Sequence, residues 1–329
     1  MRRKQPQERR CSYVVWLDRA IASPDELRDF SSYLSTVGLS DGDVVILDPS
    51  PRLQFEMQRQ TLRWVGRHMS VPPQYRLAGG GVDLVRAAAE LAACEKVIVA
   101  TSDVRYSAVE LEQLCQLLDT HEVVEPQDYV EPLPWWGGID AARILVHRGV
   151  EPLPDHAATF AFRRTAVRAL RGLELTDPND DQVRRLVATG AEVFPASDVF
   201  VRREPPALEE WLTARPRYAG DDFAMPVKTA FFFALLPMLF LVTILGGLRL
   251  FGGYAGVVAV ASVSLALRGR AGAASVFPLR ACLFAPLWVF ERSISVYWAL
   301  FRKLRGVEED PAHVFVAEGR SGAKVASGE

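Results

Sequence analysis

Apolar and polar residues follow two different patterns along the chain. Up to about residue 226, short apolar runs alternate with amphipathic segments. The runs at 13–17, 43–48 and 96–100 have the length of buried strands, and the Ser-Pro-Asp-Glu segment at 23–26 is a typical helix start. Alternation of this kind predicts an α/β domain with a mainly parallel sheet and helices on both faces, which is a three-layer arrangement.

The pattern changes after residue 227. Residues 229–245 and 254–267 carry no charge, and the segment 246–253 between them is rich in glycine. A membrane-spanning helix needs about 20 apolar residues. We therefore predict a transmembrane helical hairpin with helices at about 228–247 and 252–268. A buried helix of a soluble protein remains an alternative for the second run alone.

A third apolar stretch predicts a helix at about 276–303. It contains Arg280, Glu291 and Arg302, which are spaced eleven residues apart. Eleven residues are close to three helical turns, so these charges would share one narrow stripe. Two interpretations stay open: an interfacial helix, or a third span whose polar stripe is turned inward.

Positive charges predict the orientation of the hairpin. Lys228 precedes it, Arg268 and Arg270 follow it, and Arg249 lies at its tip. The positive-inside rule then places both ends of the hairpin in the cytoplasm, so we expect a multi-pass protein of the cell membrane with a large cytoplasmic domain. The expected division is a basic flexible tail at 1–11, a soluble domain at 12–226, a membrane region at 227–305 and a disordered tail at 306–329.

Composition and missing motifs exclude several classes of protein. The chain has 38 Lys and Arg against 40 Asp and Glu, which argues against a nucleic-acid partner. None of the four cysteines forms a C-x-x-C pair and no histidine cluster accompanies them, so zinc ligation and a disulfide framework are both unfavoured. The sequence contains no G-x-S-x-G elbow and no Walker loop, so hydrolase and NTPase functions lack support.

Acidic residues follow three of the predicted strands. Asp18 follows the first strand, Asp48 ends the second, and Asp103 comes after the strand at 96–100. Ligands of α/β sheets bind beyond the carboxyl ends of the strands. Each acid alone is also a common turn or cap residue. Together they could serve a base, a ribose and a divalent metal bound to a diphosphate, because Mg²⁺ needs only one or two protein carboxylates.

The order of these segments resembles the family 2 glycosyltransferases, which have a GT-A fold. It is most similar to an actinobacterial-type subgroup with C-terminal membrane helices. The resemblance covers about residues 13–305. The segments that carry it are VATSDVR at 99–105, EPQDY at 125–129, PLPWW at 132–136, DAARILVHR at 140–148, TFAFRR at 159–164 and RPRY at 215–218.

The resemblance implies transfer of a sugar from a nucleotide-diphosphate donor, with inversion, to a lipid or lipid-linked glycan at the membrane. Residues 12–226 would be the catalytic domain. Asp103 would hold a divalent metal, Mg²⁺ or Mn²⁺, and Asp48 the nucleoside base or ribose. Arg86 would lie near the nucleotide, and Arg217 and Tyr218 near the diphosphate or the acceptor.

The sequence departs from the family pattern at several of these positions. Thr101 replaces the first carboxylate of the D-x-D motif, Ala214 replaces a glutamine, and Pro-Asn at 178–179 replaces the pair that carries the general base. Asp181 or Asp180 could supply this base, or could simply cap a helix. A non-catalytic relative that binds a nucleotide sugar or a partner enzyme is therefore the alternative function. A transporter is weaker, since the predicted spans are too few.

Overall fold

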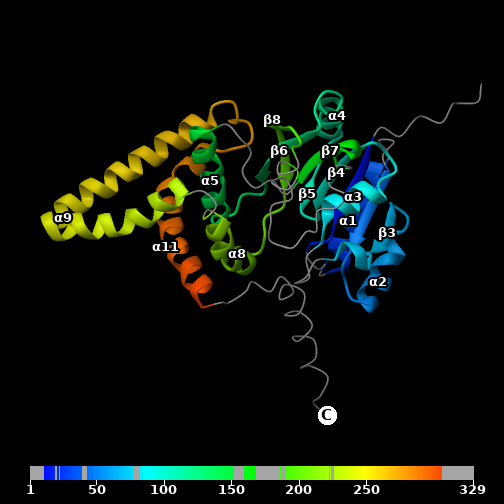
Figure 1. The fold of residues 1–329 in the computed structure, drawn as a ribbon, viewed down its shortest axis with the longest axis horizontal. Helices are drawn as coiled ribbons and strands as arrows, with labels where there is room; N and C mark the ends of the chain where they lie inside the picture. Colours follow the sequence, from blue (N-terminus) through cyan, green and yellow to red (C-terminus); the bar gives the residue numbers. More distant parts are fainter. Residues whose placement is uncertain are drawn as a thin grey trace, which may run out of the picture. The chain divides into compact units, whose positions relative to one another are not determined.

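The computed structural model describes residues 11–18, 21, 23–38, 43–76, 82–151, 159–167, 186, 190–221, 223 and 226–305 (Figure 1). These residues form two compact units. The sheet unit contains the described residues up to 128 and those from 159 to 202. The helical unit contains the described residues of 129–151 and 203–305.

A single mixed sheet forms the centre of the sheet unit. Strand β1 (Ser12–Trp16) lies between β2 (Asp43–Asp48) and β4 (Lys96–Thr101), and both pairings are parallel. Parallel pairing continues from β2 to β3 (Arg67–Ser70), whereas β7 (Thr159–Arg163) runs antiparallel to β4. Among the described residues the strand order is β3-β2-β1-β4-β7-β6-β8-β5, where β5 is Val104–Arg105, β6 is Val123–Val130 and β8 is Val193–Arg203. The expected parallel sheet is thus confirmed for four strands.

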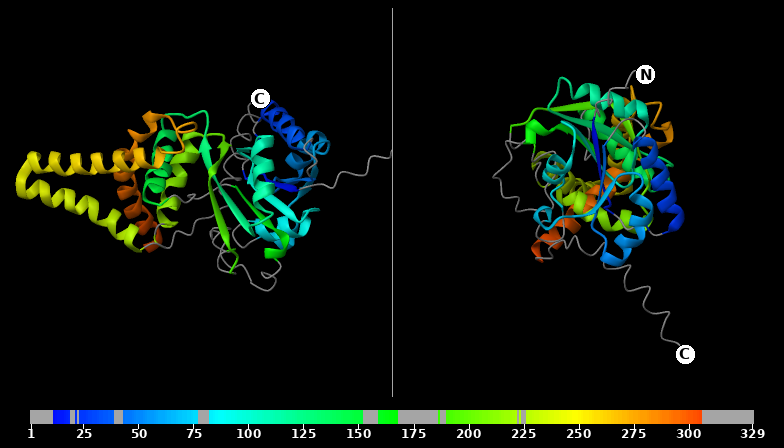
Figure 2. Two further views of the ribbon diagram at one scale, coloured as in Figure 1. Left: turned by 90° about the horizontal axis from the view of Figure 1, so that it is seen from above. Right: turned by 90° about the vertical axis from the view of Figure 1, so that its right-hand side faces the viewer.

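Helices cover both faces of this sheet, as the alternation along the strands requires. Tyr13 and Val15 of β1 pack toward α1 (Pro24–Gly38) and α4 (Ala108–Leu117), whereas Val14 packs toward α3 (Leu84–Leu91) on the other face. The two faces are visible in Figure 2. The remaining short elements of this unit are α2 (Arg52–Leu62), the 3-10 turn Pro73–Tyr75 and α6 (Arg164–Val167). The three-layer α/β fold predicted from the sequence is confirmed.

Side-chain caps fix the starts of two helices of this unit. The Asp83 carboxylate accepts the backbone N–H of Arg86 at the start of α3. Ser107 and Glu110 form a reciprocal capping box at the start of α4. Caps of this type stabilise a helix by about 1 kcal/mol each, so both helices begin at defined residues.

The helical unit is dominated by a long hairpin, α9 (Pro226–Arg270). The chain reverses at Gly246 and Gly247, and Gly247 has a φ of +59°, which favours glycine. The arms lie side by side, since the Tyr254 hydroxyl donates to the Leu235 carbonyl over 3.3 Å (Figure 1). Residues 227–270 count as one helix across the kink. By length and composition, this is the one helix of the described chain that is apolar enough to cross a membrane. The two predicted helical arms are therefore present.

The stretch predicted as one helix over 276–303 forms two helices. The first is α10 (Leu279–Cys282), whose C-cap is Leu283, and the second is α11 (Ala285–Leu304), which has a proline in its first turn. Proline is favoured at a helix start but breaks a helix interior, which explains the interruption. Arg280 is exposed on α10, whereas Glu291 lies on α11 and is mostly buried. The three charges therefore do not form one continuous stripe.

A glycine crossing joins α5 (Gly137–Val150) to the second arm of α9. A Cβ atom at Gly269 would lie 1.9 Å from the Leu145 carbonyl oxygen, and one at Gly149 would lie 2.1 Å from that of Leu265. Two helix backbones approach this closely only where both lack side chains. Residues 137–150, which the sequence analysis placed in the soluble domain, thus pack with the C-terminal helices, together with α8 (Leu208–Asp221) and α11.

Candidate functional site

The three predicted acids lie at one edge of the parallel strands. Because β2, β1 and β4 are parallel neighbours, Asp48, Asp18 and Asp103 all follow carboxyl ends at the same edge. A direct contact joins two of the strand ends. Asp18 Oδ1 accepts the backbone N–H of Ser102 over 3.1 Å and its hydroxyl over 2.6 Å. The structure therefore places the acids where an α/β sheet binds its ligand.

The turn after β4 carries Asp103 and is held by several hydrogen bonds. The Thr101 hydroxyl donates to Asp103 Oδ1. Arg105 Nη1 donates to the carbonyl oxygens of Ser102, over 2.5 Å, and of Val104, over 3.0 Å. Ser102 and Asp103 are both buried. This turn is therefore a defined structure at the edge of the sheet.

Buried tyrosines lie beside this turn. The Tyr33 hydroxyl is 3.1 Å from the Tyr13 hydroxyl and accepts the backbone N–H of Tyr106 over 3.0 Å. The Tyr106 hydroxyl lies 2.5 Å from Thr159 Oγ1. Burial raises the pKa of Tyr33 and raises the pKa of Tyr106 well above its ordinary value. These phenols therefore stay neutral at physiological pH and support the turn as uncharged hydrogen-bonding groups.

Asp48 is more fully engaged than the sequence suggested. Its Oδ2 lies 2.8 Å from His68 Nε2, and its Oδ1 accepts the backbone N–H of Ser50 over 2.8 Å. The side chains of Asp48 and His68 are 0% and 1% exposed, and the His68 ring stacks on Phe55 with centroids 4.4 Å apart. A nucleoside that binds at Asp48 must therefore either break the contact between Asp48 and His68 or bind beside both residues. His68 itself was missed, because β3 has no apolar pattern that marks it as a strand.

Arg86 keeps an accessible guanidinium group. Its side chain is largely exposed, its Nε donates to Glu90 Oε1 over 3.1 Å, and its guanidinium lies 5.9 Å from the centroid of the Tyr75 ring. The contacts with Glu90 and Tyr75 occupy only part of the guanidinium group, which has five N–H donors. Arg86 can therefore bind an anion without losing its position on α3.

Four predicted residues cannot be placed in the same way. Asp180 and Asp181 lie outside the described residues. Arg217 and Tyr218 belong to the backbone of α8, but their side chains lie outside the described part. The roles of these residues stay predictions.

The residues at the sheet edge fit a metal that arrives with a diphosphate. Among the described residues, no group of three or more His, Cys, Asp or Glu side chains could hold a metal ion by itself. Mg²⁺ commonly takes one or two carboxylates and completes its shell with phosphate and water oxygens. Asp103 supplies one carboxylate, next to the Thr101 hydroxyl. The fit is to a metal shared with a ligand.

A second charged cluster, which the sequence analysis missed, lies inside the helical unit. Asp140 of α5 binds two residues of α8: its Oδ1 accepts from Arg215 Nη2 over 2.5 Å, and its Oδ2 accepts from Trp211 Nε1 over 2.6 Å. The Arg215 guanidinium stacks on the Trp211 ring at 4.0 Å, and its Nη1 lies 3.9 Å from Glu291 Oε2 of α11. This cluster joins three helices, so its evident role is to hold them together.

Comparison with known proteins gives a limited result. No family model and no curated protein matches the chain. Among solved structures, a mannosyltransferase from Pyrobaculum calidifontis in complex with GDP-Man and Mn²⁺ is 16% identical, with 89% of each chain covered and a TM-score of 0.47. Glucosyl-3-phosphoglycerate synthase from Mycobacterium tuberculosis in complex with Mn²⁺, UDP-Glc and phosphoglyceric acid is 15% identical, with 64% of this chain and 77% of that chain covered and a TM-score of 0.42. Similarity at this level does not decide the activity of this chain.

Proposed function

We propose that the chain is a membrane-anchored glycosyltransferase. It would move a sugar from a nucleotide-diphosphate donor to a lipid or a lipid-linked glycan, with inversion. The observation that carries the proposal is the buried turn with Asp103, which Asp18 ties to the carboxyl end of the neighbouring parallel strand. This edge is where α/β sheets bind nucleotide ligands, and the sequence resemblance assigns the same turn to the metal and the diphosphate.

Each residue at the edge has a role that matches its surroundings. Asp103 would hold Mg²⁺ or Mn²⁺, which when bound neutralises charge on the leaving diphosphate. Arg86 would place a second positive charge beside the nucleotide, a form of electrostatic stabilisation. Asp48, held by His68, would lie at the nucleoside. Removal of the proton from the acceptor hydroxyl is assigned to Asp181 or Asp180, a step typically worth about 10²–10⁴-fold in rate.

The hairpin supports the membrane part of the proposal. Large apolar side chains of α9, among them Phe240, Leu245 and Val257, are exposed rather than buried within the unit. Exposed apolar surface of this extent is unfavourable in water and is typical of contact with lipid. Lys228 and Arg268 at the two ends of the hairpin favour a cytoplasmic position for both.

Donor binding tests this function. The full chain, purified in detergent, would be titrated with UDP- and GDP-sugars, with and without Mn²⁺ or Mg²⁺, while release of nucleoside diphosphate is followed. We expect metal-dependent binding and slow release, both abolished by Asp103→Ala. The matched control is Asp119→Ala, since Asp119 is an exposed acid that pairs with Lys96. Failure of the wild-type chain to bind any donor would contradict the proposal.

A second candidate is a non-catalytic protein that binds a nucleotide sugar or a partner enzyme. It is favoured by Thr101 at the position of a metal-ligating carboxylate and by the engagement of both Asp48 oxygens. Tight donor binding that is independent of metal and without turnover would favour this candidate.

A further inference from the structure

Arg105 bonds to the backbone on both sides of Asp103. Its Nη1 donates to the Ser102 carbonyl, over 2.5 Å, and to the Val104 carbonyl, over 3.0 Å. These two carbonyls belong to the residues that directly flank Asp103 in the chain. One guanidinium nitrogen therefore restricts the peptide groups before and after the candidate metal ligand.

Aromatic rings fix the guanidinium itself. Its carbon lies 4.9 Å from the centroid of the Tyr33 ring and 5.4 Å from that of Phe30, both on α1. Tyr33 also accepts the backbone N–H of Tyr106, the next residue after Arg105. Cation–π contacts and the Tyr33 hydrogen bond thus hold the side chain and the adjoining backbone to the same helix.

The turn is held from a second element as well. Asp18 at the end of β1 accepts both the N–H and the hydroxyl of Ser102. The segment from Ser102 to Val104 is therefore joined to α1 through Arg105 and to β1 through Asp18. A metal ligand must be held within about 0.5 Å of its working position, and a turn with such supports is preorganised in this sense.

We propose that Arg105 is a positioning residue that sets the Asp103 turn to receive a divalent metal bound to a nucleoside diphosphate. This inference rests on the proposed function, since it requires that Asp103 bind such a metal. Arg105 acts on the ligand through the backbone of the turn. Its loss is therefore expected to weaken metal-dependent binding and to leave metal-free binding of the nucleotide largely unchanged.

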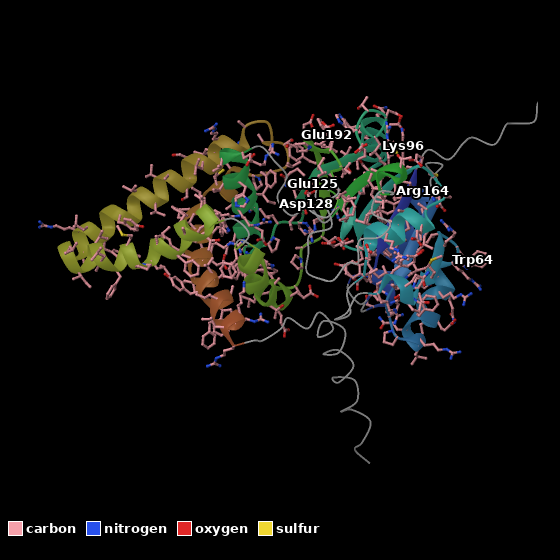
Figure 3. The ribbon with its side chains drawn as sticks, viewed as in Figure 1. Trp64, Lys96, Glu125, Asp128, Arg164 and Glu192 are labelled. Atoms are coloured by element: carbon pink, nitrogen blue, oxygen red, sulfur yellow. The ribbon has the colours of Figure 1, made fainter. Side chains whose placement is uncertain are left out.

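The experiment combines calorimetry with hydrogen exchange. UDP and GDP would be titrated into wild type, Arg105→Leu and Arg105→Lys, each with and without Mn²⁺, and amide exchange of residues 101–105 would be measured without ligand. The matched control is Arg63→Leu, because Arg63 also stacks on an aromatic ring, that of Trp64 at 4.7 Å. Trp64 lies on the outside of the sheet unit (Figure 3).

We expect Arg105→Leu to weaken Mn²⁺-dependent nucleotide binding by about tenfold or more, because losing a residue that supports a metal ligand typically costs about 10–100-fold in metal affinity. The same change should speed exchange in the turn. Arg105→Lys should recover part of the affinity, because it keeps the charge above the rings. The control should match wild type. If Arg105→Leu does not fold, the lysine variant gives the same comparison with a smaller change.

Three results would overturn the proposal. The first is unchanged Mn²⁺-dependent binding in both Arg105 variants. The second is an equal loss of binding with and without Mn²⁺, which would indicate general destabilisation. The third is faster exchange in the turn with no change in metal dependence. Absence of nucleotide binding by wild type is a different failure, because it removes the proposed function itself.

Discussion

In the sheet unit, Val14, Val45 and Val99 are buried at the centre, whereas the ion pair of Asp25 and Arg28 lies exposed on α1. The helical unit differs in its surface and in one charged cluster among its helices. Val257 and other apolar residues of α9 are exposed, and Asp140, Arg215 and Glu291 meet in the interior. The first pattern is typical of a protein in water, and the second is the pattern that the proposed membrane anchor requires.

This difference predicts which substitutions destabilise each unit most. Removing a buried methylene group weakens the sheet unit gradually, because apolar contacts are many and each is small. The helical unit also contains the cluster of Asp140, Arg215 and Glu291, and breaking a buried ion pair leaves an uncompensated charge. Variants that remove a charge from the interior cluster, or that place a charge on an exposed surface, therefore test whether each unit lies in water or in lipid.

The largest effect is expected for Asp140→Ala. This change removes the closer of the two carboxylates beside the buried Arg215, leaves it only Glu291 at 3.9 Å, and removes the acceptor of Trp211. It should destabilise the helical unit by about 3–5 kcal/mol. Thermal unfolding in detergent, followed by tryptophan fluorescence, measures the effect. Asp25→Ala is the control, because its ion pair is exposed and contributes little. Equal effects of the two variants would show that the interior cluster has no special weight.

A matched pair of valines compares the two surfaces. Val257 on α9 and Val109 on α4 have similar exposed fractions, 69% and 66%. Val257→Lys should cost about 3 kcal/mol of membrane insertion if this position faces the bilayer core, whereas Val109→Lys should change stability by less than about 0.5 kcal/mol. The fraction of protein that resists alkaline extraction from membranes measures the first. Tolerance of lysine at both sites would contradict a lipid environment for α9.

The next largest effect on stability is expected for substitutions at glycines of the hairpin. Gly269→Leu would force a side chain against the Leu145 carbonyl and should cost about 1–3 kcal/mol by separating α5 from α9. Gly252→Ala is the matched change, because a Cβ atom there has no neighbour within 4 Å. Since alanine favours helix over glycine by about 1 kcal/mol, this control should be neutral or stabilising. Unfolding midpoints of both variants in the same detergent decide between these outcomes.

The smallest predicted effect concerns pH. Burial raises the pKa of Asp43, but hydrogen bonds from Arg67, the Ala93 N–H and Ser12 outweigh burial and lower it below the ordinary value. The resulting stabilisation is present above the unfolded pKa of about 4, and is lost as the pH falls through the lower folded pKa. Asp43→Asn should therefore destabilise the chain by about 1–2 kcal/mol at pH 7 and by less at pH 3.

Urea unfolding of wild type and Asp43→Asn at the two pH values measures this difference. Asp119→Asn is the control. Hydrogen bonding to Lys96 also lowers the pKa of Asp119, but this side chain is largely exposed. A constant difference between wild type and Asp43→Asn at both pH values would contradict the assigned network.

The sequence predicted those features that depend on local pattern. The strands with Val14, Ile46 and Ile98 were found from their apolar runs, and the reversal at Gly246 and Gly247 from its glycines. Position along the chain also placed Asp18, Asp48 and Asp103 at one edge, because parallel strands end on the same side. These inferences needed no knowledge of contacts between distant residues.

Features that depend on distant contacts could not be found in this way. The amphipathic pattern of α5 shows that one face is buried, but not that Gly149 meets the hairpin. His68 reaches Asp48 from β3, whose sequence Arg-His-Met-Ser carries no strand signal. The pairing of Asp140 with Arg215 joins residues 75 positions apart, and neither residue alone is unusual.

Transfer of sugar to lipid is the most direct test of the whole account. Membranes that contain the full chain would be incubated with UDP- and GDP-sugars radiolabelled in the sugar, with Mn²⁺, and the label in the organic extract would be counted. The account predicts label in the lipid fraction for wild type and for Asp119→Ala, and none for Asp103→Ala. Nucleotide binding without any label in lipid or lipid-linked glycan, for wild type and all donors, would contradict it.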